Sequence, residues 1–390
     1  MSSINYINKI LKLKDFSVEK IENKHNNIKI YGKMVVKEQT CPCCGHKTTR
    51  IHDYRKQEIK DLSAFGKTVT IILNKRRYLC TNCGKRFIES VPFLAKYQRR
   101  TKRLNNTIID KLRDIVSFSH AAKEMDISVS TVIRIFDYIS YTKPDLPEVI
   151  GIDEFKGNTG NEKYQCILTD IKNKKVIDIL PNRYECNLID YFKSLDRNNT
   201  KYFVSDMWRT YSNIANTYFK KAVYVVDKYH FVRQVTWAFE NVRKEVQKKF
   251  QKDRRIYIKH SKRLLIKRYK SLKDEEKQAL TVILNYNNDL YKAYLLKEDF
   301  YNIMESKSSE EAKKAIGEWI YQAENSNISR FMDCANTMRN WITGISNSFK
   351  CSYTNGFTEG CNNKIKILKR NAYGYRNFKR FRNRILHIFS

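Results

Sequence analysis

The chain has 390 residues, 42% of them hydrophobic and 30% charged, a composition that excludes a disordered polymer and allows about two or three globular domains. Lys and Arg outnumber Asp and Glu by 75 to 41, for a net charge of +34. That excess indicates a polyanionic partner, although a generally basic proteome would also produce it. No apolar run reaches the length of a membrane span and the first residues lack a signal-peptide layout, so we expect a cytoplasmic protein without a membrane partner.

Residues 1–95 are predicted to form a strand-rich domain that binds one structural zinc ion. Strand-like runs occur at Asn27–Val36 and Lys67–Leu73. The expected ligands are two Cys-x-x-Cys pairs, each followed by glycine: Cys41 with Cys44, and Cys80 with Cys83. Two such knuckles complete a tetrahedral Cys₄ site, and strands between them suit a zinc ribbon. Cys43 or His46 could replace a ligand, and four buried structural cysteines are the alternative.

Residues 96–143 are predicted to be a basic helical region with a helix-turn-helix. Ala121 and Ala122 lie where two helices must approach closely. Ser128 or Ser130 would cap the second helix, which would present three side chains to the major groove: Ser130, Thr131 and Arg134. Just upstream, four basic residues favour contact with DNA phosphates: Arg99, Arg100, Lys102 and Arg103. An ordinary helical hairpin is the alternative.

Pro144 and Pro147 mark a linker, and residues 148–230 are predicted to begin an α/β domain. Five strands are expected at Val149–Phe155, Tyr164–Ile171, Lys175–Leu180, Tyr202–Ser205 and Ala222–Val226. Helices are expected at Asn187–Leu195, before the fourth strand, and near Tyr211–Phe219, before the fifth. This is the element order of a ribonuclease-H-like core, in which the first and fourth strands lie side by side.

Residues 231–346 are predicted to be an all-helical insertion into that core. No proline follows Pro181, and apolar residues recur at steps of three and four: Phe231, Val235, Phe239, Val242, Val246 and Phe250. We interpret this stripe as core packing. Residues 347–390 would supply the final helix and a basic C-terminal segment. The expected fold is therefore multidomain α+β: a zinc ribbon, a helix-turn-helix, and a ribonuclease-H-like core interrupted by helices.

Three carboxylates of this basic chain lie in sequence contexts that differ from one another. Asp153 follows the apolar run of the first strand, Asp206 ends the fourth, and Glu359 opens a basic helix. Two strand-end aspartates and a helical glutamate could hold a pair of Mg²⁺ ions, or Mn²⁺, against a phosphodiester. Taken singly, each acid could instead cap a helix or stabilise its N-terminus. The prediction of a catalytic site rests on the three together.

Further candidate residues flank these acids. Lys366 follows Glu359 by two helical turns and could hold a DNA phosphate beside the metals, with an exposed lysine as the alternative. His230 could orient a water or contact DNA, or could be a neutral histidine satisfied in the core. Basic residues of the same late helix are expected to contact DNA: Lys364, Lys369 and Arg370.

The chain resembles the DDE transposases of the ISL-three family of bacterial insertion sequences. The cysteine pairs and the helix-turn-helix carry the resemblance together with three blocks: Gly151-Ile152-Asp153-Glu154, Ser205-Asp206-Met207-Trp208 and Thr358-Glu359-Gly360-Cys361-Asn362-Asn363-Lys364-Ile365-Lys366. It covers nearly the whole chain, and the block around the glutamate is its most specific part.

The resemblance implies that Asp153, Asp206 and Glu359 are the catalytic triad, with a helical insertion before the glutamate. Asp227 and His230 match an acidic-x-x-His element of the family. The implied function is an insertion-sequence transposase that binds terminal inverted repeats and acts on double-stranded DNA, target DNA included, at the nucleoid. Synapsis of two ends makes a homodimer or larger assembly the expected state by analogy.

The expected chemistry is metal-assisted phosphoryl transfer. A water activated by one Mg²⁺ hydrolyses the strand at the element's end, and the released 3′-hydroxyl then attacks target DNA in line. Two rival functions belong to other classes: a non-catalytic zinc-ribbon and helix-turn-helix regulator, and a ribonuclease-H-like nuclease that cuts without end specificity.

Overall fold

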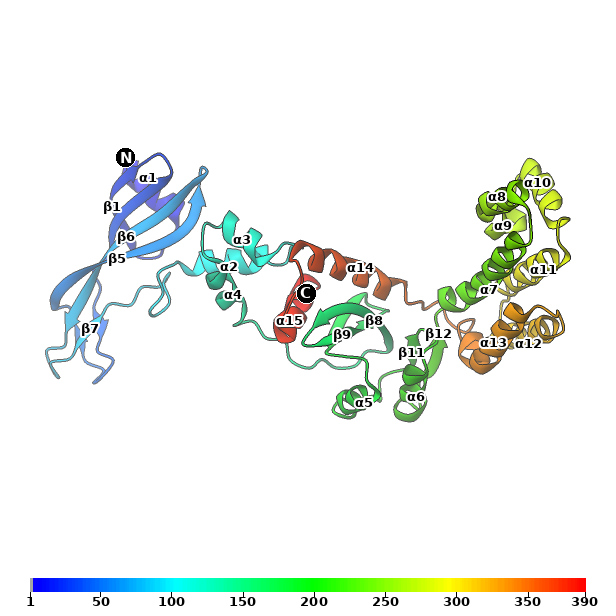
Figure 1. Ribbon diagram of the computed structural model, residues 1–390. Coiled ribbons are helices and arrows are strands. Elements are labelled where there is room, and N and C mark those ends of the chain that lie inside the picture. Colours follow the sequence, from blue (N-terminus) through cyan, green and yellow to red (C-terminus); the bar gives the residue numbers. More distant parts are fainter. Residues whose placement is uncertain (1–2) are drawn as a thin grey trace. The chain divides into compact units, whose positions relative to one another are not determined.

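The computed structural model describes residues 3–390, which divide into two compact units of mixed helices and strands (Figure 1). The first unit runs up to Ser140 and includes Arg370–Tyr373, whereas the second comprises Tyr141–Lys369 and Gly374–Ser390. Within the described range, we find no helix with both the length and the apolarity needed to cross a bilayer.

A five-stranded sheet forms the N-terminal part of the first unit. Its strands run in the order β1-β2-β6-β5, with β7 paired to β6. The bounds of these and the flanking elements are α1 Ser3–Leu11, β1 Phe16–Asn23, β2 Asn27–Met34, β3 Gln39–Thr40, β4 Lys47–Thr48, β5 Ile51–Ala64, β6 Lys67–Leu79 and β7 Arg86–Ile88. The two strand-like runs of the sequence correspond to β2 and β6, and β6 continues beyond the expected end at Leu73 because its polar residues pair with β5.

Three short helices follow in the first unit: α2 Lys102–Lys111, α3 Phe118–Glu124 and α4 Val129–Phe136. The residues just before α2 are not helical, although the sequence predicted a basic helical region over residues 96–143. Their backbone instead pairs with the end of β5, where the amide of Thr101 donates to the carbonyl of Lys60 over 3.0 Å. Thr101 then caps α2 by accepting from the amide of Leu104, so this short extended segment fixes where the helical region begins.

The second unit is built on a five-stranded sheet with the order β10-β9-β8-β11-β12. Its strands are β8 Val149–Thr159, β9 Glu162–Asp170, β10 Lys175–Leu180, β11 Tyr202–Ser205 and β12 Val223–Val226. The first three are antiparallel neighbours, whereas β11 pairs in parallel with both β8 and β12. The expected contact between the first and fourth strands is thereby confirmed.

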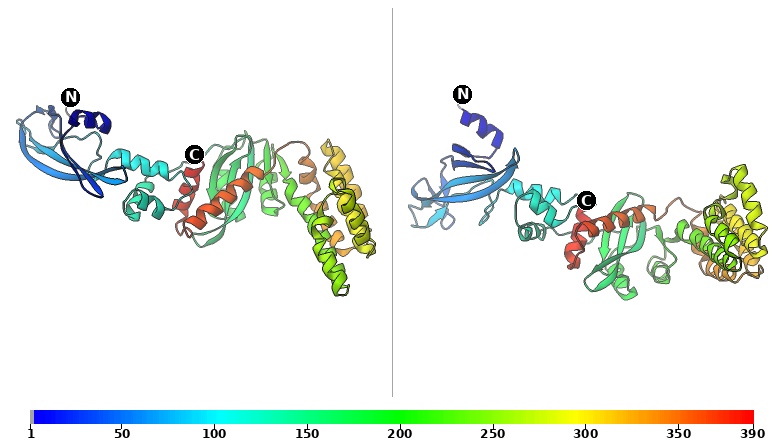
Figure 2. Two further views of the ribbon diagram at one scale, coloured as in Figure 1. Left: turned by 90° about the horizontal axis from the view of Figure 1, so that it is seen from above. Right: turned by 45° about the horizontal axis from the view of Figure 1, so that its top comes forward.

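Helices cover both faces of this sheet. On one face lie α5 Glu185–Lys193 and α6 Arg209–Tyr218, and on the other lie α14 Gly356–Asn371 and α15 Phe378–Ile388 (Figures 1 and 2). Ile150 and Ile152 pack with α5 and α6 in the main core. Phe155, an odd-numbered residue of the same strand, contacts Phe381 of α15, because side chains alternate between the two faces of a strand.

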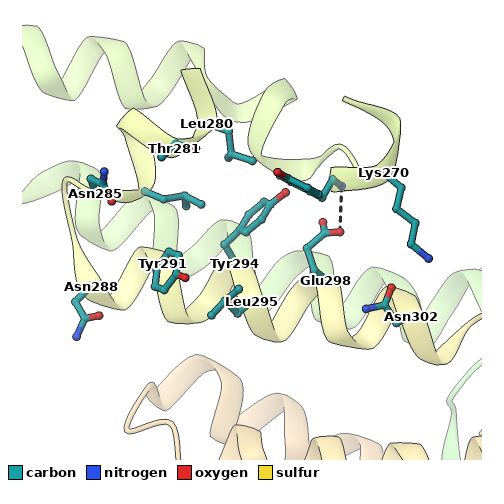
Figure 3. Close-up of a pocket in the computed structure, with 12 residues that line it drawn as sticks. Lys270, Leu280, Thr281, Asn285, Asn288, Tyr291, Tyr294, Leu295, Glu298 and Asn302 are labelled. Carbon is teal, nitrogen blue, oxygen red and sulfur yellow. Dashed lines mark hydrogen bonds between the residues drawn. The ribbon is translucent and has the colours of Figure 1, made fainter. Parts of the chain in front are cut away.

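The stretch between β12 and α14 is nearly all helical, as the sequence predicted. Its elements are α7 Lys228–Lys248, α8 Lys252–His260, α9 Lys262–Ile266, the 3₁₀ turn η1 Tyr269–Ser271, α10 Asp274–Leu284, α11 Asn288–Ile303, α12 Ser309–Glu324 and α13 Ser329–Asn347. The expected apolar stripe is buried along α7, and Phe250, just beyond the end of this helix, is partly buried. A pocket of about 680 Å³ opens between η1, α10 and α11 (Figure 3), and its lining includes none of the expected site residues.

Candidate functional site

A cluster of carboxylates forms where β8 and β11 run side by side. Val204 is paired with Gly151, so Asp206 and Asp153, each two residues further on, lie next to each other at the end of β11. Glu154 joins them, and oxygens of the three carboxylates lie within 4.8 Å of one another. The sequence indicated the two aspartates but not Glu154, whose only sequence signal is its position directly after Asp153.

Helix α14 is held against this part of the sheet by polar contacts. The amide of Asn362 donates to Asp153 Oδ2 over 2.9 Å. Buried hydroxyls of Thr358 and Thr169 lie 2.7 Å apart. These contacts place Glu359 near Asp153, which lies within β8 rather than at a strand end, and the charge of Glu359 is one of those that raise the pKa of Asp153. Asn362 is a further residue that the sequence did not single out, although it lies one helical turn after Glu359.

Glu359 belongs to a second, adjoining group of potential ligands. Its Oε1 lies 3.8 Å from His230 Nε2, and ligand atoms of Glu359, His230 and Asp227 lie within 4.8 Å of one another. Asp227 is buried between β12 and α7, where its Oδ1 accepts the amide of Asn355 over 2.9 Å. The three expected acids are thus distributed over two neighbouring groups, Asp153 and Asp206 in one and Glu359 in the other.

The electrostatics of the first group favour a bound cation. Burial raises the pKa of Asp153 to about 7, and the charges of Glu154 and Glu359 add to the shift. Burial likewise raises the pKa of Asp206 to about 7, reinforced by Glu154 and Asp153. Asp206 Oδ1 is buried and has no hydrogen-bond partner among the described residues. Carboxylate oxygens without a positive or donating partner are costly to bury, and they are the ligands that hard divalent cations such as Mg²⁺ prefer.

These pKa values predict how the stability of the metal-free protein depends on pH. Because the folded-state pKa of Asp206 is raised, the contribution of this residue to stability is most favourable below about pH 4 and falls as the pH rises toward about 7. Asp206→Asn should therefore raise the free energy of unfolding by about 1–3 kcal/mol at pH 8 and leave it unchanged at pH 4. Denaturant titrations of both proteins at both pH values, without added divalent cation, measure this. Equal stability at pH 8 would contradict it.

The four expected cysteines form one cluster at the base of the β5–β6 hairpin. Their sulfurs lie within 4.8 Å of one another, with Cys41 Sγ 3.6 Å from Cys83 Sγ and Cys44 Sγ 3.5 Å from Cys80 Sγ. Sulfurs around a tetrahedral zinc ion lie about 3.8 Å apart, given Zn–S distances of about 2.3 Å. The donor set therefore fits a structural zinc site. Cys43 is exposed and outside the cluster.

Each cysteine pair is shaped by its following glycine. Gly45 and Gly84 have φ of +73° and +69°, which favours glycine, and each amide donates to the carbonyl of the first cysteine over 3.0 Å. The backbone amide of His46 donates to the Cys44 thiol and, with the neighbouring cysteines, lowers its pKa to about 6. A lowered pKa favours the thiolate, the form that binds zinc.

The helix-turn-helix candidate has the expected local geometry. Ala121 and Ala122 are buried, and the side chain of Ser128, one of the two expected caps, accepts from the amide of Thr131. Ser130 and Arg134 are exposed on α4 and Thr131 is half-buried. Ser128 is therefore the N-cap of α4, and its hydroxyl lies 3.1 Å from that of Ser130.

The basic residues expected to contact DNA differ in their exposure and in the hydrogen bonds that they already make within the protein. Those that are largely exposed are Arg99, Lys102, Lys364, Lys366 and Arg370. Arg100 donates to Asn105 over 2.8 Å. Arg103 is paired with the buried carboxylate of Asp61 and also donates to the carbonyl of Leu11, whereas Lys369 donates to the carbonyl of Lys156. The guanidinium of Arg103 is thus used within the first unit.

Comparison with known proteins agrees with this division of the chain. Residues 150–385 match the ISL3 family model described as a transposase. Residues 37–83 match the zinc-finger of the transposases of IS204, IS1001, IS1096 and IS1165, and residues 89–140 match the helix-turn-helix domain of transposase family ISL3. The three matches follow one another without overlap.

Individual relatives support the same grouping. The chain is 26% identical over 380 residues to the transposase for insertion sequence element IS1001 of Bordetella parapertussis, covering 94% of this chain and 93% of that protein. It is 30% identical over 125 residues to the transposase for IS1557 of Mycobacterium tuberculosis, covering 32% and 28% of the two chains. A 50-residue stretch is 48% identical to a Lactococcus lactis protein named ATP-dependent protease, but it covers only 13% of this chain. Because the ISL3 transposase model matches more than half of the sequence, the chain belongs to the ISL3 family of transposases.

Proposed function

We propose that this transposase cleaves DNA at the ends of an insertion sequence and joins the released ends to target DNA, using a DDE-type, Mg²⁺-dependent site. The carboxylate cluster is the observation that carries the proposal. Asp153, Glu154 and Asp206 gather oxygens within 4.8 Å, one of them buried without a partner. On a chain of net charge +34, such a concentration of half-buried acids is expected where a cation is bound.

The proposed catalytic core has a ribonuclease-H-like fold, formed by residues 148–230 and 347–390 around a helical insertion at 231–346. The strand order β10-β9-β8-β11-β12 supports this, since three antiparallel strands are extended by two parallel ones. Residues 1–95 and 96–143 are the proposed zinc-ribbon and helix-turn-helix domains. The insertion begins directly after His230 and ends shortly before Glu359, so both of its ends adjoin the site.

Asp153, Asp206 and Glu359 are the proposed metal ligands, and Asp227 and His230 adjoin Glu359. When bound there, divalent cations would activate the attacking oxygen and offset charge on the leaving oxygen. The chain's own residues orient the ligands: Asn362 donates to Asp153 Oδ2 and the backbone amide of Glu154 donates to Oδ1, so both contacts fix the direction of this carboxylate. Asn355 ties Asp227 to the carbonyl of Ile152 through its backbone and side-chain amides. This network fixes the geometry before DNA binds.

DNA recognition is assigned to the first unit and to the late basic helix. Ser130, Thr131 and Arg134 of α4 are proposed to read the terminal inverted repeats, with Arg99, Arg100 and Lys102 on the phosphates. Lys364, Lys366 and Arg370 extend the phosphate contacts along α14, and Arg103 and Lys369, which already donate to protein acceptors, are proposed as secondary contacts. Because two ends must be joined, we propose a homodimer or larger assembly on DNA, acting at the nucleoid.

Cleavage and joining of the element's own ends test the proposal. The protein should nick DNA at the junction of an inverted repeat and join the 3′ end to a target plasmid when Mg²⁺ or Mn²⁺ is added, but not without a divalent cation. Sequencing of the products locates the cut. Cutting without regard to the repeat and without joining would favour a nuclease, and repeat binding without any cleavage would favour a regulator.

A further inference from the structure

The positively charged side chain of Arg183 lies at the margin of the carboxylate cluster. Arg183 occupies the loop between β10 and α5, and its Nη1 donates to Glu154 Oε1 over 2.8 Å. Its guanidinium carbon lies 4.5 Å from the ring centroid of Tyr164 and 4.8 Å from that of Trp208. Two aromatic rings and one carboxylate therefore fix both the plane and the direction of the guanidinium.

Glu154 is itself held in place. Its second oxygen accepts the hydroxyl of Tyr211 over 3.2 Å, and that hydroxyl lies 3.2 Å from the buried Cys166 Sγ. The carboxylate also lies within 4.8 Å of oxygens of Asp153 and Asp206. Since Glu154 bridges the cluster and the arginine, the charge of Arg183 is presented at the place where the proposed reaction occurs.

Arg183 does not have the contacts of an arginine with a purely structural role. Arg243 in α7 is such a residue: it is 4% exposed, and its Nε, Nη1 and Nη2 all donate to protein acceptors. The side chain of Arg183 is 36% exposed, and its Nε and Nη2 have no acceptor among the described residues. A guanidinium that is held rigidly but retains free donors can receive an anion without rearrangement.

We propose that Arg183 is a catalytic residue that donates its free N–H groups to a non-bridging oxygen of the scissile phosphodiester. The inference rests on the proposed function. Charge builds on the phosphoryl oxygens during in-line transfer, and a preorganised donor aimed at such charge contributes about 10²- to 10³-fold to the rate. The planar donor fork of arginine matches two oxygens in a way that the single ammonium of lysine does not.

A mutant cycle with Glu154 separates this role from simple charge balance. Arg183→Gln should slow single-turnover cleavage by about 10²-fold or more while repeat binding stays within about twofold. The same substitution should slow cleavage by at least about tenfold when added to Glu154→Gln. If Arg183 only neutralises Glu154, it would cost nothing in that background, and this result would overturn the proposal. Lys172→Gln is the charge-matched control, because Lys172 pairs with Glu148, which directly precedes β8, and it should leave cleavage unchanged.

DNA binding measured under conditions that prevent cleavage provides a second test of the contact. In the absence of a divalent cation, an uncharged methylphosphonate at the scissile position should weaken DNA binding by the wild-type protein several-fold and leave binding by Arg183→Gln unchanged. An equal loss for both proteins would refute the contact. The proposed function is judged separately: if wild-type protein cleaves and Asp153→Asn does not, while Arg183→Gln behaves as wild type, only the role of Arg183 is lost.

Discussion

Asp153→Asn is expected to abolish end cleavage and strand transfer, with a loss of at least about 10³-fold, because it would remove a charged ligand from the proposed metal site. Asp153 stands between the two ligand groups: its carboxylate adjoins those of Glu154 and Asp206, and its pKa also responds to Glu359. Asparagine has nearly the same shape but no charge. Single-turnover assays on DNA carrying the inverted repeat measure the effect.

The variant should remain folded and bind DNA. The pKa of Asp153 is raised to about 7 by burial and neighbouring acids, so a neutral residue at this position relieves repulsion in the metal-free protein. Repeat binding, which we assign to the first unit, should stay within a few-fold of wild type. Asp190→Asn, at an exposed position on α5, is the control and should cleave normally. Strand transfer by Asp153→Asn at the wild-type rate would overturn the assignment of the triad.

Loss of zinc is expected to have the largest effect on stability. Cys44→Ser removes one of four sulfurs that lie at zinc-ligand separations, and structural zinc contributes on the order of 10 kcal/mol to the folding of small domains. The cysteine-bearing part of the first unit should therefore unfold and repeat binding should be lost, because the site holds together the open end of the β5–β6 hairpin, where β5 begins and β6 ends. Metal content, limited proteolysis and repeat binding measure these changes.

Cys43→Ser is the matched control for this experiment. Cys43 lies next to Cys44 in the chain but is exposed and outside the sulfur cluster. The control should retain one zinc ion per chain, resist protease as the wild type does and bind the repeat. A Cys44→Ser protein that stayed protease-resistant and bound DNA without zinc would show that the four cysteines are merely buried structural residues.

Local patterns in the sequence were sufficient for much of the second unit. The bounds of β10 and β11 agree with the apolar runs that predicted them, and β8 and β9 differ by a few residues. These strands are short, apolar and separated by turn residues, so their hydrophobic pattern dominates the local conformation. The strands of the first unit were harder to predict from the sequence, because β5 is rich in polar residues and becomes a strand by pairing with β6.

Residue chemistry and spacing by themselves predicted the clustering of the four cysteines and the proximity of Asp153 and Asp206, since the two cysteine knuckles and the adjacent strands β8 and β11 are encoded by short stretches of chain. Tertiary structure alone decided that Glu359 faces His230 and Asp227, that Glu154 joins the aspartates, and that Arg183 lies between Tyr164 and Trp208. The ion pair between Arg103 and Asp61 was likewise decided by the tertiary structure. Most of these contacts join residues that are distant in sequence, and the position of Glu154 depends on the orientation of one side chain within β8. No local pattern of hydrophobicity or charge specifies such a contact.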